Sequence, residues 1–133
     1  MFKNAELVRV LVVDDESMIA DTLVTILNMN GFQTSAAYSG KEAVEAAATL
    51  KPHILIMDVI MAGMNGIEAA ICICKRAPDC KVILFSGQPG AVDLLDRAHA
   101  DGHRFELLAK PLHPQVIMDH LNAAGRTMAQ FRQ

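Results

Sequence analysis

The sequence has few cysteines, and its positive charges are not clustered. Its 133 residues include three cysteines, Cys72, Cys74 and Cys80, with no CxxC pair and no apolar secretion signal at the start. We therefore expect reduced thiols in a cytoplasmic protein, in which these cysteines serve as small apolar residues. The 12 Lys+Arg residues form no run. Direct binding of nucleic acid through clustered phosphate contacts is therefore not expected.

A long hydrophobic run is also missing. The segment from Thr22 to Gly40 carries no charge, but polar residues such as Asn28, Asn30 and Gln33 interrupt it. We expect no membrane span and no membrane partner.

The length and composition fit one domain. A chain of 133 residues, 52% of them hydrophobic, buries enough surface to need no disulfide or metal for its core. We expect a single domain over residues 1–133, with a core over about residues 7–124. Residues 125–133, which contain no acidic side chain, would form an end that can fray.

Short apolar runs alternate with segments of helical periodicity along the whole chain. The predicted strands are Val8–Val13, Gln33–Tyr38, Ile54–Met57, Val82–Phe85 and Phe105–Ala109. The predicted helices cover 18–29, 39–50, 65–74, 89–101 and 114–124, and Ser39 and Asn65 have the spacing of helix N-caps. Met18 and Met29 in the first helix and Met57 in a strand are interpreted as core residues.

Five alternating units with short loops predict right-handed crossovers and a parallel sheet covered on both faces. This is the doubly wound α/β class. Among its five-stranded versions, the flavodoxin-like (βα)5 fold with strand order 2-1-3-4-5 places the polar run Gln33–Tyr38 at an edge of the sheet.

Polar side chains follow four of the buried runs. Asp14 and Asp15 follow the first strand, and Asp58, Ser86 and Lys110 follow the third, fourth and fifth. The carboxyl ends of parallel strands share one edge, where such folds bind ligands. A single acid at such a position is more often a helix cap, but here every strand end of the set carries a polar group.

The chemistry of this set favours a metal and a phosphoryl group. Three carboxylates packed together repel one another unless a cation neutralises them. Oxygen ligands with open positions suit Mg²⁺, which is often completed by phosphate oxygens. With a lysine and a hydroxyl nearby, the site is suited to phosphoryl transfer, and one carboxylate could be the nucleophile.

Taken together, these residues resemble the receiver domain of two-component response regulators, the CheY-like family. The motifs are Leu11–Glu16 (LVVDDE), Ile54–Met61 (ILIMDVIM), Phe85–Gly87 (FSG) and Ala109–Leu112 (AKPL). Their order and spacing extend the likeness over nearly the whole chain.

The resemblance implies a role for each site residue. Asp58 would be phosphorylated by a sensor histidine kinase, a phosphotransfer protein or a small phosphodonor. Mg²⁺ would be held by Asp15, Asp58 and the main-chain carbonyl of Ile60, with Asp14 acting through a metal-bound water. The remaining residues implied to bind the phosphoryl group and to switch are Ser86, Gly87 and Lys110.

Phosphorylation would then change the face made by the fourth helix, the fifth strand and the fifth helix. This face would bind a downstream protein or a second copy of the chain as a homodimer. The chain departs from the family pattern at Ala62, where proline is usual, and at Leu107, where an aromatic residue is usual. Ser86 replaces the commoner threonine and keeps the hydroxyl.

Two alternatives to a phosphoacceptor switch remain open. Ala62 and Leu107 would fit a degenerate receiver that acts as a phosphate-independent adaptor. A phosphatase of the haloacid dehalogenase type also uses an aspartate nucleophile at a strand end. It typically has a second aspartate two residues later, where this chain has Ile60, so we expect no enzyme acting on an external substrate.

Overall fold

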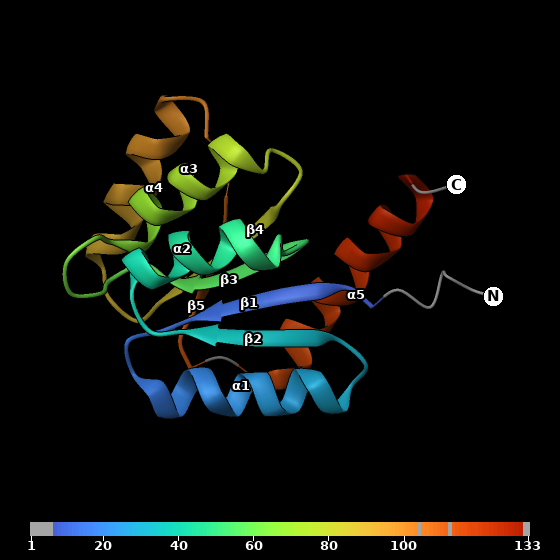
Figure 1. Cartoon of the computed structure of the whole chain (residues 1–133). Coiled ribbons are helices and arrows are strands. Elements are labelled where there is room, and N and C mark those ends of the chain that lie inside the picture. Colours follow the sequence, from blue (N-terminus) through green and yellow to red (C-terminus); the bar gives the residue numbers. More distant parts are fainter. Residues whose placement is uncertain (1–6, 104, 112, 132–133) are drawn as a thin grey trace.

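Five parallel strands and five helices alternate along the chain (Figure 1). The computed structural model describes residues 7–103, 105–111 and 113–131, with side chains as far as residue 123. The strands are β1 Arg9–Val13, β2 Gln33–Ala37, β3 Ile54–Asp58, β4 Lys81–Ser86 and β5 Glu106–Ala109. The helices are α1 Ser17–Met29, α2 Gly40–Leu50, α3 Gly66–Arg76, α4 Gly90–Ala100 and α5 Pro114–Phe131.

The strand order is 2-1-3-4-5, and every neighbouring pair is parallel. The predicted flavodoxin-like doubly wound fold is therefore confirmed, with the polar strand β2 at an edge. The strand limits differ slightly from the prediction, since Asp58 and Ser86 are the last residues of β3 and β4. Helix α5 runs beyond residue 124 to Phe131, and residues 132–133 lie outside the described part.

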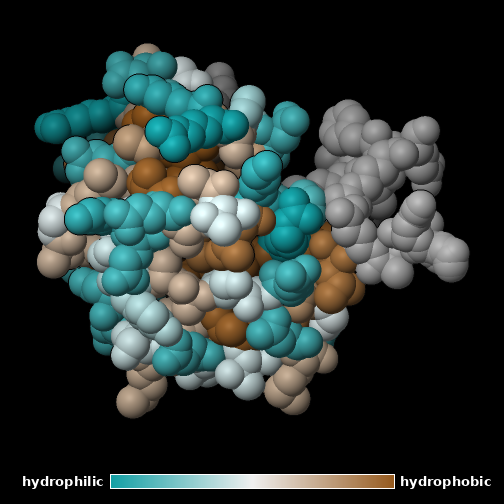
Figure 2. Space-filling model, viewed as in Figure 1, coloured by the Kyte–Doolittle hydropathy of each residue, from teal (hydrophilic) through white to brown (hydrophobic). Residues whose placement is uncertain are grey.

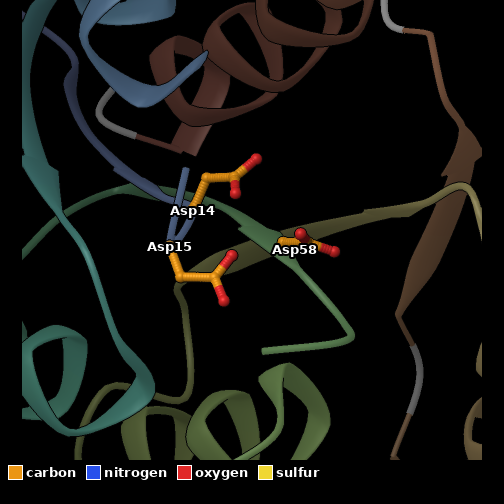
Figure 3. Close-up of side chains that lie close together, drawn as sticks. All are labelled: Asp14, Asp15 and Asp58. Atoms are coloured by element: carbon orange, nitrogen blue, oxygen red, sulfur yellow. The ribbon is translucent and has the colours of Figure 1, made fainter. Parts of the chain in front are cut away.

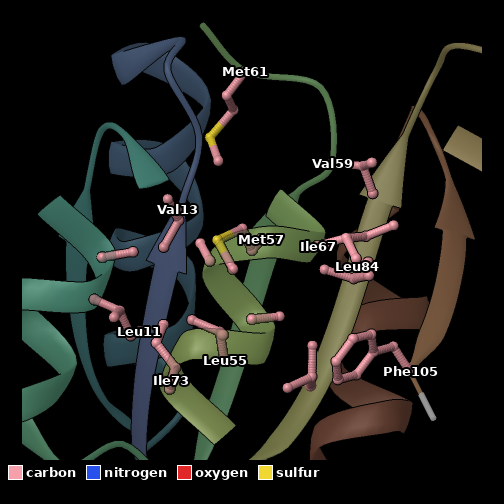
Figure 4. Packing of buried hydrophobic residues seen from close by; sticks show 14 of the residues in the cluster. Leu11, Val13, Leu55, Met57, Val59, Met61, Ile67, Ile73, Leu84 and Phe105 are labelled. Atoms are coloured by element: carbon pink, nitrogen blue, oxygen red, sulfur yellow. The ribbon is translucent and has the colours of Figure 1, made fainter. Parts of the chain in front are cut away.

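The sheet has a hydrophobic core on each face, as strands buried on both sides require. One core lies under α1 and α5 and contains Val12, Ile56 and Phe85 from the strands. The other lies under α2, α3 and α4 and contains Leu11, Leu55 and Leu84 (Figure 4). From the side shown in Figure 2, hydrophobic atoms are visible mainly in gaps between hydrophilic surface residues.

The side chains of Met18 and Met29 are 80% exposed, so their interpretation as core residues was wrong. They lie about three turns apart on the side of α1 opposite its buried residues Ala20, Leu23 and Leu27. Only Met57, with 0% exposure, is in the core as predicted.

The cysteines differ from one another in burial. Cys80 is buried, and burial raises the pKa of its thiol to about 12. Cys74 is half-buried against the core of α2, α3 and α4, whereas Cys72 is exposed. The interpretation as small apolar residues therefore holds for Cys80 and Cys74 and fails for Cys72, whose side of α3 faces solvent.

The predicted caps of α2 and α3 are present. The Ser39 side chain accepts a hydrogen bond from the backbone N–H of Glu42. Asn65 and Glu68 form a capping box, in which each side chain accepts a hydrogen bond from the other residue's backbone N–H. These caps fix where each helix starts, and α3 starts just after the loop that follows β3.

The side chain of Asn28 covers the outer edge of β2. Its Oδ1 accepts a hydrogen bond from the Thr34 N–H at 2.8 Å, and its Nδ2 donates to the Thr34 carbonyl at 3.4 Å. The N–H of the preceding residue, Gln33, donates to the carbonyl of Val8, just before β1. Because backbone groups alternate in direction along a strand, those of Thr34 face away from β1. Asn28 therefore satisfies edge groups that another strand could otherwise pair with.

We predict that Asn28→Ala lowers the free energy of unfolding by about 1 kcal/mol, because two hydrogen bonds to the edge strand are lost. Urea denaturation measures the change. Asn122→Ala, at an exposed position on α5, is the control for the higher helix propensity of alanine. Equal stability of the two variants would contradict the prediction.

Candidate functional site

Three aspartates meet at the carboxyl edge of the sheet (Figure 3). Asp14 and Asp15 follow β1, and Asp58 ends β3. Each offers a carboxylate oxygen, and these oxygens all lie within 4.8 Å of one another. Asp14 is 0% exposed and Asp58 5% exposed, whereas Asp15 is exposed. The register of parallel β1 and β3, which pairs Val13 with Met57, brings the two strand ends level.

Lys110, directly after β5, reaches into this cluster. Its Nζ lies 3.1 Å from Asp58 Oδ2 and 3.3 Å from Asp14 Oδ2, and 5.2 Å from the centre of the Phe85 ring. Burial lowers the pKa of Lys110, but the hydrogen bonds and charges of Asp58 and Asp14 outweigh it and raise the pKa overall. The lysine is therefore a permanent cation between two buried acids.

The carboxyl group of Asp58 has competing neighbours. Burial raises its pKa, the hydrogen bond and charge of Lys110 lower it, and the nearby Asp14 raises it further. The backbone N–H of Ile60 donates to Asp58 Oδ1 at 3.2 Å and also lowers the pKa. The balance is a raised pKa, so one lysine does not fully compensate the buried carboxylates.

This imbalance fits a bound divalent cation. The donors are all carboxylate oxygens, which are ligands that Mg²⁺ accepts, and the exposed Asp15 leaves the cluster open on one side. Two further positive charges would favour the ionised form of Asp58, against the burial and the Asp14 charge that raise its pKa.

Ser86 and Gly87 lie at the end of β4, beside Lys110. The Ser86 carbonyl accepts a hydrogen bond from the Lys110 N–H at 3.1 Å, which joins the ends of β4 and β5. The buried Ser86 Oγ accepts a hydrogen bond from the Gln88 N–H at 3.0 Å. Among the described residues, Ser86 makes no hydrogen bond with the three aspartates. Gly87 faces the Lys110 side chain, where an added Cβ would lie 3.5 Å from the Lys110 Cβ.

Leu107 lies in β5 opposite Leu84 and packs partly buried against the core under α2, α3 and α4. Its side chain thus lies on the face of the sheet that α2, α3 and α4 cover. Ala62 lies in the loop after β3, next to Gly63, whose φ of +76° is in the region that favours glycine.

Glu16, the last residue of the motif LVVDDE, also lies close to this cluster. Its Oε1 lies 3.9 Å from Lys110 Nζ, and its side chain is 67% exposed. In the sequence, the only signal for this role is an acid directly after the aspartate pair, and in the structure this residue is the N-cap of α1.

An apolar groove of about 640 Å³ borders Lys110. Its lining residues come from α1 and from the segment after β5: Met18, Ile19, Thr22, Leu23, Ile26, Lys110, Pro111 and Pro114. In the described part of the chain, no helix is both long enough and apolar enough to cross a membrane.

Gly66, the first residue of α3, sets how closely this helix approaches Asp58. A Cβ at Gly66 would lie 2.1 Å from the Asp58 carbonyl oxygen and 2.9 Å from the Val59 Cα. The Gly66 N–H also donates to the Val59 carbonyl at 2.8 Å. Only glycine fits here, because both nearest neighbours are backbone atoms that cannot rotate away.

Comparison with known sequences gives consistent matches. The family described as response regulator receiver domain matches residues 10–122. A chemotaxis protein CheY of Thermotoga maritima is 34% identical over 119 residues, which are 89% of this chain and 98% of that protein. A DNA-binding response regulator MtrA of Mycobacterium tuberculosis is 28% identical, over 89% of this chain. The match covers 50% of the length of this MtrA, so the present chain spans about half of that relative.

Comparison with solved structures also finds response regulator proteins. A response regulator receiver domain protein from Clostridium thermocellum superposes with a TM-score of 0.83 at 28% identity, covering 94% of this chain and 99% of that one. A chemotaxis protein CheY4 from Vibrio cholerae has a TM-score of 0.79 at 22% identity, covering 90% and 99%, a likeness of fold.

We predict that Gly66→Ala lowers the free energy of unfolding by more than about 2 kcal/mol, because the new methyl group displaces α3 from the Asp58 backbone. Gly90→Ala is the matched control. Gly90 is likewise the first residue of its helix, α4, and has no atom within 4 Å of an added Cβ. Urea denaturation of both variants checks the contrast, and equal midpoints would show that the close approach is unimportant.

We also predict that millimolar Mg²⁺ raises the Tm of the wild-type protein. Binding to the folded state alone stabilises by about 1.4 kcal/mol at about ten times Kd. Asp15→Asn should remove most of this response while leaving the metal-free fold intact, because Asp15 is exposed. Asp79→Asn, at an exposed acid in the turn before β4, should respond like wild type. A wild-type Tm that does not change with Mg²⁺ would contradict the metal site.

Proposed function

We propose that this chain, which belongs to the response regulator receiver domain family, is a phosphoacceptor switch in which Asp58 accepts a phosphoryl group. The donor would be a sensor histidine kinase, a phosphotransfer protein or a small phosphodonor. The observation that carries the proposal is the contact of Lys110 with both Asp58 and Asp14 at the carboxyl edge of the sheet. Receiver domains act as signalling switches, and no turnover of an external substrate is proposed.

In this proposal, Asp58 is the nucleophile. One carboxylate oxygen, Oδ1, accepts from the Ile60 N–H, and the other, Oδ2, lies against Lys110. As a carboxylate oxygen forms its bond to phosphorus, the donor's P–N or P–O bond breaks and the leaving atom takes the bonding electron pair. Lys110 is placed to neutralise the phosphoryl charge that arrives beside Asp58, which is the main contribution a protein makes to this chemistry.

Mg²⁺ is the proposed cofactor. Asp15, Asp58 and the carbonyl of Ile60 would hold it, with Asp14 contributing through a water. When bound, the ion supplies the positive charge that lets phosphoryl oxygens approach three carboxylates. Three carboxylates against one lysine support this role, as does the pKa of Asp58, which burial and, to a smaller extent, Asp14 raise.

The groove beside Lys110 supports a protein partner as phosphodonor. A phosphohistidine must come within bonding distance of Asp58, so its carrier has to cover the surface around Lys110. That surface is apolar, being lined by α1 and by Pro111 and Pro114, and it suits an amphipathic helix.

The proposed output runs from Ser86 to the face of α4, β5 and α5. Ser86 Oγ, which now accepts from Gln88, would instead donate to a phosphoryl oxygen, with Gly87 and Lys110 moving beside it. Leu107 would transmit the change by aliphatic packing, since no aromatic ring is present there. Val92 on α4 and Val116 on α5 are 51% and 41% exposed, which fits binding of a downstream protein or of a second copy.

The proposal extends to the whole chain. We take residues 1–133 as one receiver domain acting in the cytoplasm through protein partners, with no direct contact to nucleic acid or membrane. A haloacid-dehalogenase-type phosphatase is disfavoured because Ile60, with no acidic side chain, stands two residues after Asp58.

Incubation with acetyl phosphate and Mg²⁺, followed by intact-mass analysis, tests the function. We expect the wild type to gain one phosphoryl group, Asp58→Asn to gain none because the nucleophile is missing, and Asp79→Asn to behave like wild type. A wild type that gains no phosphate would favour the degenerate, phosphate-independent adaptor. Rapid release of phosphate from many esters would favour the phosphatase.

A further inference from the structure

Glu16 is an exposed acid at the entrance to the cluster of Asp14, Asp58 and Lys110. Its Oε1 lies 3.9 Å from Lys110 Nζ, on a side chain that is 67% exposed, whereas the side chains of Asp14 and Asp58 are 0% and 7% exposed. A reactant that approaches Asp58 along Lys110 therefore comes close to the Glu16 carboxylate.

The backbone of Glu16 is fixed by the site itself. Its N–H donates to Asp14 Oδ1 at 2.9 Å, and its carbonyl accepts from the N–H groups of Ile19 and Ala20 in the first turn of α1. The side chain thus starts from an anchored position, and its reach toward Lys110 does not depend on a flexible loop.

The charges around the entrance explain what Glu16 can do. The cluster holds the carboxylates of Asp14, Asp15 and Asp58 against one lysine, and Glu16 adds a further negative charge on the solvent side. A divalent cation would neutralise the inner acids but leave this outer charge in place. The Debye length at physiological salt is about 8 Å. Because the Glu16 carboxylate lies 3.9 Å from Lys110 Nζ, its charge still acts on an anion that approaches the lysine.

We propose that Glu16 is a specificity-determining residue that selects phosphodonors by charge, disfavouring acyl phosphates relative to donors with a protonated leaving nitrogen. This rests on the proposed phosphoacceptor function. Acyl phosphates approach as dianions, whereas a phosphoramidate or a protonated phosphoimidazole carries less negative charge. The same carboxylate repels the former more strongly and so favours transfer from a histidine over small acyl phosphates.

The test compares two donors. Rates of phosphorylation of the full chain by acetyl phosphate and by phosphoramidate are measured with Mg²⁺ at neutral pH, by intact mass. Glu16→Gln should raise the acetyl phosphate rate by about three- to tenfold, the size expected for removing one partly screened charge. The phosphoramidate rate should rise less, so the ratio of the two rates increases. At about 1 M salt, where the Debye length is about 3 Å, the difference between variant and wild type should largely vanish.

Two control variants separate charge from structure. Glu16→Asp keeps the negative charge and should keep a donor ratio near that of wild type. Asp79→Asn removes an exposed acid at the opposite edge of the sheet, in the turn before β4, and should leave the ratio unchanged.

The outcomes are distinct. An unchanged donor ratio in Glu16→Gln, or a Glu16→Asp variant that behaves like Glu16→Gln, would overturn the role of Glu16 while leaving the phosphoacceptor function standing. A wild type that accepts phosphate from neither donor would overturn both proposals.

Discussion

The contact of the Lys110 ammonium group with two buried aspartates is the interaction on which the site depends. Asp14 and Asp58 are almost fully buried, and removing one partner of such a buried charge cluster leaves the others uncompensated. The three residues come from the ends of β1, β3 and β5. In the sheet, β4 lies between β3 and β5. The cluster therefore exists only when β1, β3, β4 and β5 are paired in the sheet.

The rest of the fold keeps these strand ends in place. The cores on the two faces of the sheet hold β3, which is buried along its whole length, and Gly66 lets α3 approach the backbone of Asp58. The buried carboxylate of Asp58 opposes stability at neutral pH, since burial and, to a smaller extent, the Asp14 charge raise its pKa. Local conflict of this kind, inside a well-packed domain, is typical of functional sites.

Which predictions succeeded follows from the range of the interactions concerned. The caps at Ser39 and Asn65 need only residues three positions apart, so sequence spacing revealed them. The burial of Met18 and Met29 was predicted wrongly because methionine suits both core and surface, and only packing against the sheet decides which side of α1 is covered. The contact of Glu16 with Lys110 joins two segments that are far apart in the sequence, and no local pattern encodes their relative placement.

The alternation of strands and helices, and the position of Asp14, Asp15, Asp58, Ser86 and Lys110 at strand ends, can be predicted from the amino-acid order because periodicity and capping act over a few residues. Which of these groups are in contact depends on the folded chain. In the folded chain Lys110 contacts Asp14, Asp58 and Glu16, Ser86 is hydrogen-bonded to Gln88, and Leu107 packs partly buried against the core under α2, α3 and α4. Such contacts depend on strand order, register and side-chain direction, which are set by the packing of the whole sheet.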